Sequence, residues 1–186
     1  MKDKIFYLVF FGVILALSRI IPHPPNFTPV LATAIMAPLL IKDRLTGMAI
    51  PIVAMFISDI IIGFYYWQFV IYFTILTIAL VSPMHKNYTR LGIMSVGGSV
   101  WFFIVTNFAV WIIYPYEPGN MYSYPKTFEG LITCYIAALP FFKNTLISTC
   151  LFTGLIAISI KYLDAINKKT DYLIFNLFNK IRNTTR

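Results

Sequence analysis

The chain has 186 residues, of which 59% are hydrophobic and 12% are charged, and its formal net charge is +8. Charged residues make up about 25% of an average soluble protein, and one small core cannot bury this many apolar segments, so the composition excludes a soluble domain. The basic residues lie in short stretches between apolar runs, which indicates oriented membrane helices and argues against nucleic-acid binding.

The apolar runs predict an all-α membrane protein with six transmembrane helices, because a helix satisfies its own backbone polar groups in lipid. The first run, about Lys4 to Ile21, begins like a signal peptide. No convincing cleavage site precedes Arg19, so we expect this helix to be retained. The next four helices are expected at about Thr28–Ile41, Leu45–Gly63, Gln68–Val81 and Leu91–Tyr114.

The region from Thr127 to Leu163 is too long for one span at a rise of about 1.5 Å per residue. Pro140 is expected to divide it, because a proline inside a helix removes a hydrogen bond and clashes with the preceding turn. We therefore predict an outer half-helix, Thr127–Leu139, followed by a sixth spanning helix, Pro140–Leu163.

The last segment is predicted to be a basic amphipathic helix on the cytoplasmic leaflet, with a loosely ordered tail as the alternative. Its apolar residues follow the spacing of one helical face, and basic residues lie beside them. We expect two parts, a transmembrane domain at residues 1–163 and a cytoplasmic tail at residues 164–186. The apolar face consists of Ile174, Leu177, Phe178 and Ile181, next to Lys180 and Arg182.

The distribution of basic residues predicts that both termini are cytoplasmic. With the N-terminus inside, twelve Lys and Arg residues fall in inner segments and three, Arg19, Lys126 and Lys143, fall on the outer side. An odd number of spans would mix the two sets. The inner residues are Lys2, Lys4, Lys42, Arg44, Lys86, Arg90, Lys161, Lys168, Lys169, Lys180, Arg182 and Arg186.

Polar residues within the apolar runs gather toward the outer side in this topology. A charge inside a membrane costs about 2.5–3.5 kcal/mol on insertion scales, so it faces protein or water. Arg19 and Asp59 lie at similar depths and are expected to pair. Such a pair either locks two helices together or holds a charged group of a ligand.

An amide lies within an aromatic stripe on the predicted fifth helix, where Phe103, Asn107, Trp111 and Tyr114 share one face. An apolar wall with one orienting hydrogen bond suits a ligand site. Packing and the interfacial aromatic belt explain Trp111 and Tyr114 equally well. Together with the first outer loop, the predicted ligand-binding residues are Arg19, His23, Asn26, Asp59, Asn107 and Trp111.

Signatures of enzymes are absent, since the chain contains no HExxH, GxSxG, P-loop or dinucleotide-binding motif. The two histidines, His23 and His85, fall on opposite sides of the membrane. The two cysteines, Cys134 and Cys150, indicate neither a disulfide framework nor a zinc site. Cys134 is either a soft ligand for a metal-bearing substrate or an inert apolar residue. We expect no catalysis, no cofactor and no bound metal.

The chain contains a set of short motifs, which are Arg19–Pro29, Ser58-Asp59, Phe102-Phe103, Asn107-Phe108, Trp111, Gly130-Leu131, Cys134-Tyr135, Pro140–Phe142 and Asn144-Thr145. Together they resemble an uncharacterised family of small bacterial inner-membrane proteins. That family is similar to the substrate-capture (S) components of energy-coupling-factor (ECF) transporters, the cobalamin-capturing kind included. The resemblance implies an ECF S-component-like bundle in the inner membrane that binds a vitamin-like molecule from outside for uptake. It also implies a transmembrane coupling subunit and ATPases as partners, or action alone.

Two other functions remain open at the level of the sequence. One is a structural or assembly protein of the membrane, in which the polar residues serve only helix packing. The other is a small-solute carrier that uses Asp59. A path through the membrane needs polar residues on the inner half too, and the later helices have few there, which favours a pocket open to one side.

Overall fold

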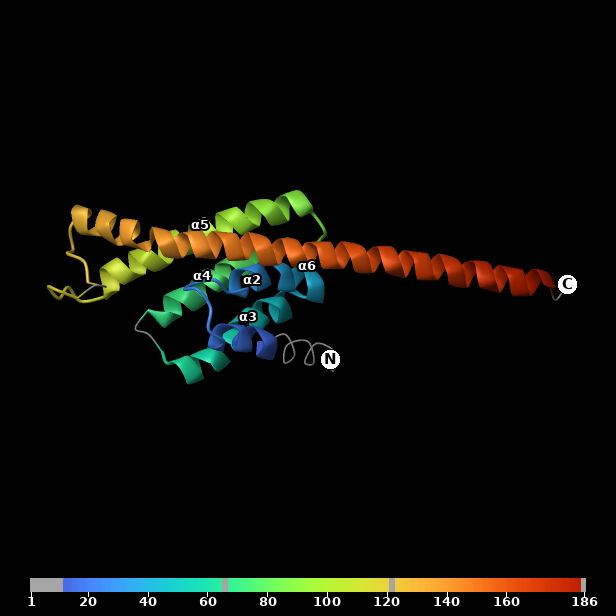
Figure 1. Cartoon of the computed structure of the whole chain (residues 1–186), viewed down its shortest axis with the longest axis horizontal. Helices are drawn as coiled ribbons and strands as arrows, with labels where there is room; N and C mark the ends of the chain where they lie inside the picture. Colours follow the sequence, from blue (N-terminus) through green and yellow to red (C-terminus); the bar gives the residue numbers. More distant parts are fainter. Residues whose placement is uncertain (1–11, 65–66, 121–122, 185–186) are drawn as a thin grey trace. The chain divides into compact units, whose positions relative to one another are not determined.

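The computed structural model is all-helical in the residues that it describes, which are 12–64, 67–120 and 123–184, without the side chains of 164, 167–168 and 171–184. The predicted first helix before Gly12 and the side chains of the predicted amphipathic face lie outside them. Figure 1 shows a helical segment at residues 12–20 and five further helices. These are α2 (Val30–Ile41), α3 (Arg44–Ile62), α4 (Gln68–Val81), α5 (Tyr88–Ile113) and α6 (Phe128–Thr184).

Helices α2 to α5 lie where the apolar runs predict them, and α4 has the predicted bounds. Side-chain caps explain where α3 and α5 begin. Asp43 accepts a hydrogen bond from the amide of Thr46 (3.1 Å), and Asn87 accepts one from the amide of Arg90 (2.9 Å). Each cap satisfies a backbone donor that the first turn leaves unpaired. The Asn87 cap starts α5 earlier than the hydrophobic pattern indicates.

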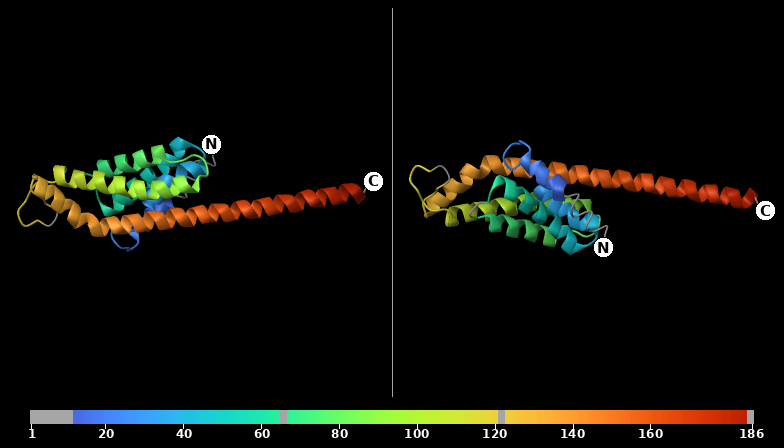
Figure 2. Two further views of the ribbon diagram at one scale, coloured as in Figure 1. Left: turned by 90° about the horizontal axis from the view of Figure 1, so that it is seen from above. Right: turned by 90° about the horizontal axis from the view of Figure 1, so that it is seen from below.

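The predicted break at Pro140 is wrong, because α6 continues through this proline from Phe128 to Thr184. The outer half-helix and the C-terminal helix are therefore parts of one helix. A proline removes one backbone hydrogen bond and bends a helix without having to end it. Figure 2 shows α6 changing direction in its first third. Pro38 in α2 and Pro51 in α3 are also inside helices.

The contacts divide the chain into two compact units, Met1–Thr153 and Gly154–Arg186, with the boundary inside α6. The predicted tail at residues 164–186 falls within the second unit. The first unit contains the segment at residues 12–20, helices α2 to α5 and the first part of α6. The site described below belongs entirely to the first unit.

Helix α2 is the most buried element of the first unit. Ala32, Ala34, Ile35 and Met36 have no exposed surface. The helix is apolar on every side, and a helix of this kind needs protein or lipid around its whole circumference. Its 12 residues extend over about 18 Å. It is therefore shorter than the roughly 20 residues that usually cross a bilayer.

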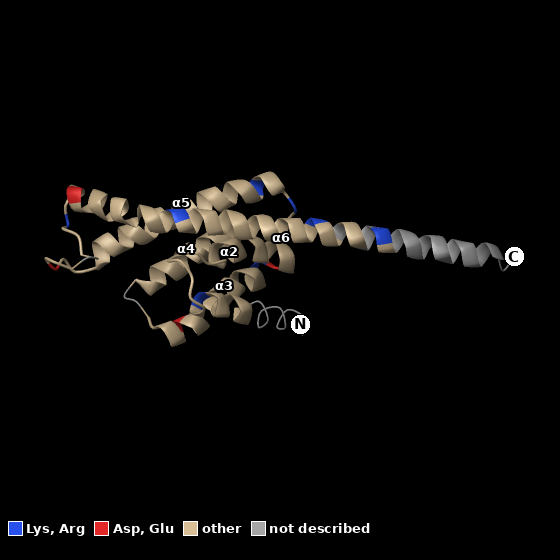
Figure 3. Ribbon diagram, in the orientation of Figure 1, with Lys and Arg blue, Asp and Glu red and all other residues tan. Residues whose placement is uncertain are grey.

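Three helical stretches are long and apolar enough to cross a membrane, by length and composition, among the residues that the structure describes. They are Arg44–Ile62, Tyr88–Ile113 and Phe128–Leu163. Helices α2 and α4 are apolar but shorter. Figure 3 shows how few charged residues the helices of the first unit carry along their length, and α2 and α4 contain none.

Replacing Gly47 with alanine is expected to lower the free energy of unfolding in detergent by about 1–3 kcal/mol, because overpacking forces the backbone apart. A Cβ at Gly47 would lie 2.5 Å from the Cα of Pro38, and this neighbour is backbone that cannot rotate away. Gly97→Ala is the matched control, since nothing lies within 4 Å of its Cβ position. Equal thermal denaturation of the two variants would contradict this packing of α3 on α2.

Candidate functional site

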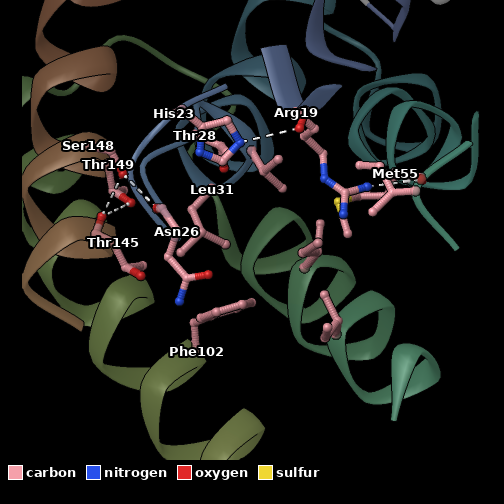
Figure 4. A pocket seen from close by; sticks show the side chains of 14 residues that line it. Arg19, His23, Asn26, Thr28, Leu31, Met55, Phe102, Thr145, Ser148 and Thr149 are labelled. Atoms are coloured by element: carbon pink, nitrogen blue, oxygen red, sulfur yellow. Dashed lines mark hydrogen bonds between the residues drawn. The ribbon is translucent and has the colours of Figure 1, made fainter. Parts of the chain in front are cut away.

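A cavity of about 290 Å³ lies in the first unit, and the side chains around it are drawn in Figure 4. The segment at residues 12–20, the loop after it and all of helices α2 to α6 contribute to its wall. One part of the wall is apolar, with Val30, Leu31, Met55, Ile62, Ile71, Ile75 and Phe102. The polar part consists of Arg19, His23, Asn26, Thr28, Thr145, Ser148 and Thr149.

A second cavity of about 170 Å³ adjoins the first. Four residues, Asn26, Ile71, Phe102 and Thr145, line both cavities. The second cavity extends toward the aromatic stripe of α5, where Asn107 is part of its wall. A ligand in the larger cavity therefore has room to extend toward α5.

Arg19 pairs with Asp59, as the sequence predicts. Its Nη1 lies 2.7 Å from Oδ1 of Asp59, whose side chain is completely buried. The same nitrogen donates to the carbonyl of Met55 (3.1 Å) and to the hydroxyl of Ser58. Burial of this charge is compensated by an opposite charge and by hydrogen bonds, which is the condition for keeping an ionised pair inside a helical bundle.

The second carboxylate oxygen of Asp59 is also occupied. It accepts hydrogen bonds from the hydroxyl of Tyr72 (2.6 Å) and from the amide of Gln68. Both donors belong to α4 and lie one helical turn apart. Asp59 thus joins α3 to α4 and, through Arg19, to the segment at residues 12–20. It lines neither cavity and instead positions Arg19, which does.

The first loop forms the rim of the cavity. Nδ1 of His23 lies 2.8 Å from the carbonyl oxygen of Pro24, and Nε2 lies 3.3 Å from the carbonyl oxygen of Arg19. Asn26 has a φ of 60°, a left-handed conformation that asparagine tolerates better than most residues. In Figure 4 its side-chain amide points into the cavity toward Phe102. The backbone of Asn26 therefore forms the turn, and its side-chain amide lines the cavity.

Helix α6 holds the first loop in place. Nδ2 of Asn144 donates to the carbonyl of Pro25 (2.9 Å), and the hydroxyl of Ser148 lies 3.4 Å from the carbonyl of Asn26. These contacts join residues more than a hundred positions apart in the chain. They fix the rim on which His23 and Asn26 lie.

The structure separates the two residues predicted on α5. Asn107 lines the second cavity, although its Nδ2 donates to the carbonyl of Phe103 (2.7 Å) in the preceding turn. Trp111 lines neither cavity. Its Nε1 donates to the carbonyl of Pro125 (2.9 Å), and the ammonium of Lys126 lies 6.0 Å from its ring centroid. Trp111, which the sequence predicts as a ligand-binding residue, therefore lies outside both cavities, and its side chain holds the loop before α6.

Sequence reasoning missed three hydroxyl residues of α6, Thr145, Ser148 and Thr149. They are almost completely buried, and their spacing of three and four places them on one helical face. Thr145 and Thr149 donate to carbonyls one turn earlier, at 3.0 and 2.7 Å. Their oxygens keep lone pairs that can accept a hydrogen bond from a ligand. The signal in the sequence is this cluster of hydroxyls within an otherwise apolar helix.

No group of three or more His, Cys, Asp or Glu side chains suited to a metal ion occurs in the described part of the chain. Cys134 is buried, and its sulfur lies 3.5 Å from the carbonyl of Asn107. Cys150 is exposed. Neither cysteine lines the two cavities.

Comparisons with known proteins give a family and no function. The family described as "Family of unknown function (DUF6580)" matches residues 1–171. No curated protein matches the chain. No solved structure matches it either.

Proposed function

We propose that this chain, which belongs to the DUF6580 family of unknown function, is an integral membrane protein that captures a vitamin-like small molecule from the outer side of a bacterial inner membrane for uptake. One observation carries the proposal, a cavity of about 290 Å³ that combines an apolar wall with a few placed polar groups. Binding sites for small molecules have this composition. We place it near the outer surface because the first loop, which the charge distribution assigns to that side, forms its rim.

The distribution of apolar and polar side chains supports a membrane location. Large apolar residues are exposed on the helices of the first unit, for example Ile60 (62%), Phe69 (65%) and Ile93 (66%). Polar residues such as Asp59 and Ser99 are completely buried. Lipid solvates such an apolar surface, whereas water does not. In this proposal α2 and α4 are two of the six spans. The loops at their ends cover the part of the bilayer thickness that these short helices do not reach.

The arrangement of the cavity supports a capture protein resembling an ECF S component. Its wall takes residues from every helical part of the first unit, so a ligand there contacts the whole bundle. Volumes of about 290 and 170 Å³ suit a compact vitamin or precursor and are far too small for a corrinoid. Among vitamin-like ligands the cavity therefore favours a small one. In this proposal the protein works with a transmembrane coupling subunit and ATPases, or it acts alone.

A structural or assembly role is the second candidate, because the Arg19–Asp59 network joins three helical segments without any ligand. A carrier that uses Asp59 has less support. Both oxygens of this carboxylate are already hydrogen-bonded, and it lines neither cavity.

A thermal-shift screen of vitamins and their precursors on purified protein without ATP tests the capture function, followed by calorimetry on the hits. Capture predicts saturable binding of at least one compact compound. A broad screen without hits would favour the structural role.

The proposed topology predicts opposite signals from two reporter fusions. A fusion after Arg186 is expected to report the cytoplasm, and one at Gly119 is expected to report the outer side, because the basic residues favour this orientation. Paired alkaline phosphatase and fluorescent protein fusions measure both positions. A C-terminus on the outer side would contradict six spans and the placement of the cavity.

A further inference from the structure

We propose that the captured molecule is a carboxylic acid and that the free edge of the Arg19 guanidinium binds its carboxylate. This inference rests on the proposed capture function and specifies the chemistry of its ligand. It follows from the way Arg19 is held, from the charges around the cavity and from the polar groups on the opposite wall.

Toward the residues that the structure describes, Arg19 uses only one of its three guanidinium nitrogens. Nη1 makes the hydrogen bonds to Met55, Ser58 and Asp59. Nε and Nη2 make no hydrogen bond to any residue within the described ranges. The side chain is 14% exposed and lines the cavity. Figure 4 shows Nη1 directed toward Met55 and the rest of the guanidinium at the cavity wall.

The unused nitrogens form the edge of the guanidinium that suits a carboxylate. Nε–H and Nη2–H point the same way in one plane, and a carboxylate accepts both in a bidentate pair. Asp59 fixes this plane, because Tyr72 and Gln68 in turn hold its second oxygen. The site is therefore arranged before a ligand enters, which lowers the entropy lost on binding.

The charges around the cavity favour an anion. No aspartate or glutamate is among its lining residues, while the cationic side chain of Arg19 lines it. Asp59 lies behind Arg19, and donors from three residues share its negative charge. A neutral ligand without a good acceptor would leave two N–H groups unpaired inside a mostly apolar pocket, and this costs free energy.

The opposite wall offers hydrogen-bond acceptors. The hydroxyl protons of Thr145 and Thr149 are used within α6, so their oxygens present lone pairs. The amide of Asn26 points into the same space and can both donate and accept. The ligand class is therefore a small carboxylic acid whose far end carries an N–H or O–H group and whose middle is apolar.

Matched acid and amide probes test the proposal on the purified full-length protein. The pairs are biotin with biotinamide and indole-3-acetate with indole-3-acetamide, each titrated by calorimetry. We expect at least one acid to bind about ten times or more tighter than its amide. Arg19→Lys is expected to remove this preference, because an ammonium still pairs with Asp59 but has no second in-plane edge. Arg90→Lys, at an exposed residue outside both cavities, should keep it.

Three results would overturn the proposal. Amides that bind as tightly as their acids, or an acid preference that survives Arg19→Lys, would exclude the carboxylate and leave capture of a neutral molecule standing. Failure of acids and amides here, together with failure of the broad vitamin screen, would overturn the capture function as well. If Arg19→Lys does not fold, the double variant Arg19→Gln/Asp59→Asn removes both charges at once, and it too must lose the acid preference.

Discussion

Asp59→Ala is expected to lower the free energy of unfolding in detergent by about 3–5 kcal/mol, the cost of breaking a buried ion pair by removing one partner. The substitution leaves the charge of Arg19 without its counter-ion, and it leaves the hydroxyl of Tyr72 and the amide of Gln68 without their acceptor. The two neutral donors then lack a partner, and the guanidinium, although still bonded to Met55 and Ser58, is a largely buried charge without compensation. Denaturation followed by circular dichroism measures the loss.

A double-mutant cycle shows whether the loss of stability comes from the contact between Arg19 and Asp59. Arg19→Ala should also destabilise, and the double variant should lose less than the sum by about 1–3 kcal/mol, because the partners touch. Glu129→Ala is the control, since this carboxylate is exposed and its removal should change stability by no more than about 0.5 kcal/mol. Additive losses at Arg19 and Asp59 would mean that the two side chains do not contact each other in the folded protein.

Thr145→Phe is expected to abolish ligand binding, with a rise in Kd of more than about 100-fold, or roughly 3 kcal/mol. Thr145 lines both cavities, so a phenyl ring at this position occupies the space where they adjoin. The protein should still fold, because the ring enters existing empty volume and displaces no packed side chain. Calorimetry with the tightest compound from the screen measures the effect.

Cys150→Phe is the matched control, at an exposed position on the same helix that lines neither cavity. The Cys150→Phe variant should bind the same compound with the affinity of the unmodified protein. Trp111→Ala should also bind normally, since Trp111 holds the loop before α6. Undiminished binding by Thr145→Phe would place the ligand elsewhere on the protein.

The elements that the sequence predicts well are those with one strong physical signal. The bounds of α4 follow from an apolar run between the aromatic sequence Phe64–Trp67 and the polar segment that begins at Ser82. The contact between Arg19 and Asp59 follows from the cost of an unpaired charge inside lipid. In each case one large contribution to the free energy decides the structure, apolar burial for α4 and charge pairing for Arg19 and Asp59. Both contributions can be recognised from the residue types in the sequence.

The course of α6 is harder to predict because proline has two outcomes in a helix. Pro140 was expected to end a half-helix, and α6 continues through it. Whether a proline ends or only bends a helix depends on the packing around the freed carbonyl, which lies in other parts of the chain. The same limit applies to Pro38 and Pro51, which stay within α2 and α3.

The candidate site was predictable in part for the same reason. Three of the residues predicted to bind a ligand, Arg19, His23 and Asn26, line the larger cavity. The sequence points to them because charges and polar loops are conspicuous among apolar runs. Thr145 and its neighbours were missed, since a hydroxyl in a helix usually bonds to its own backbone and gives a weak signal. A tryptophan at position 111 is equally suited to holding a loop and to contacting a ligand, so the sequence does not distinguish these two roles. The fold does, because the indole N–H of Trp111 donates to the carbonyl of Pro125.

The most direct test of the central claim is equilibrium binding of the tightest compound, radiolabelled, to sealed membrane vesicles of known orientation. Capture from the outer side predicts saturable binding to right-side-out vesicles that contain the unmodified protein. It predicts no binding above background for vesicles that contain Thr145→Phe at the same protein level. Equal binding by the two proteins, or binding only to inside-out vesicles, would contradict a ligand cavity that opens to the outside.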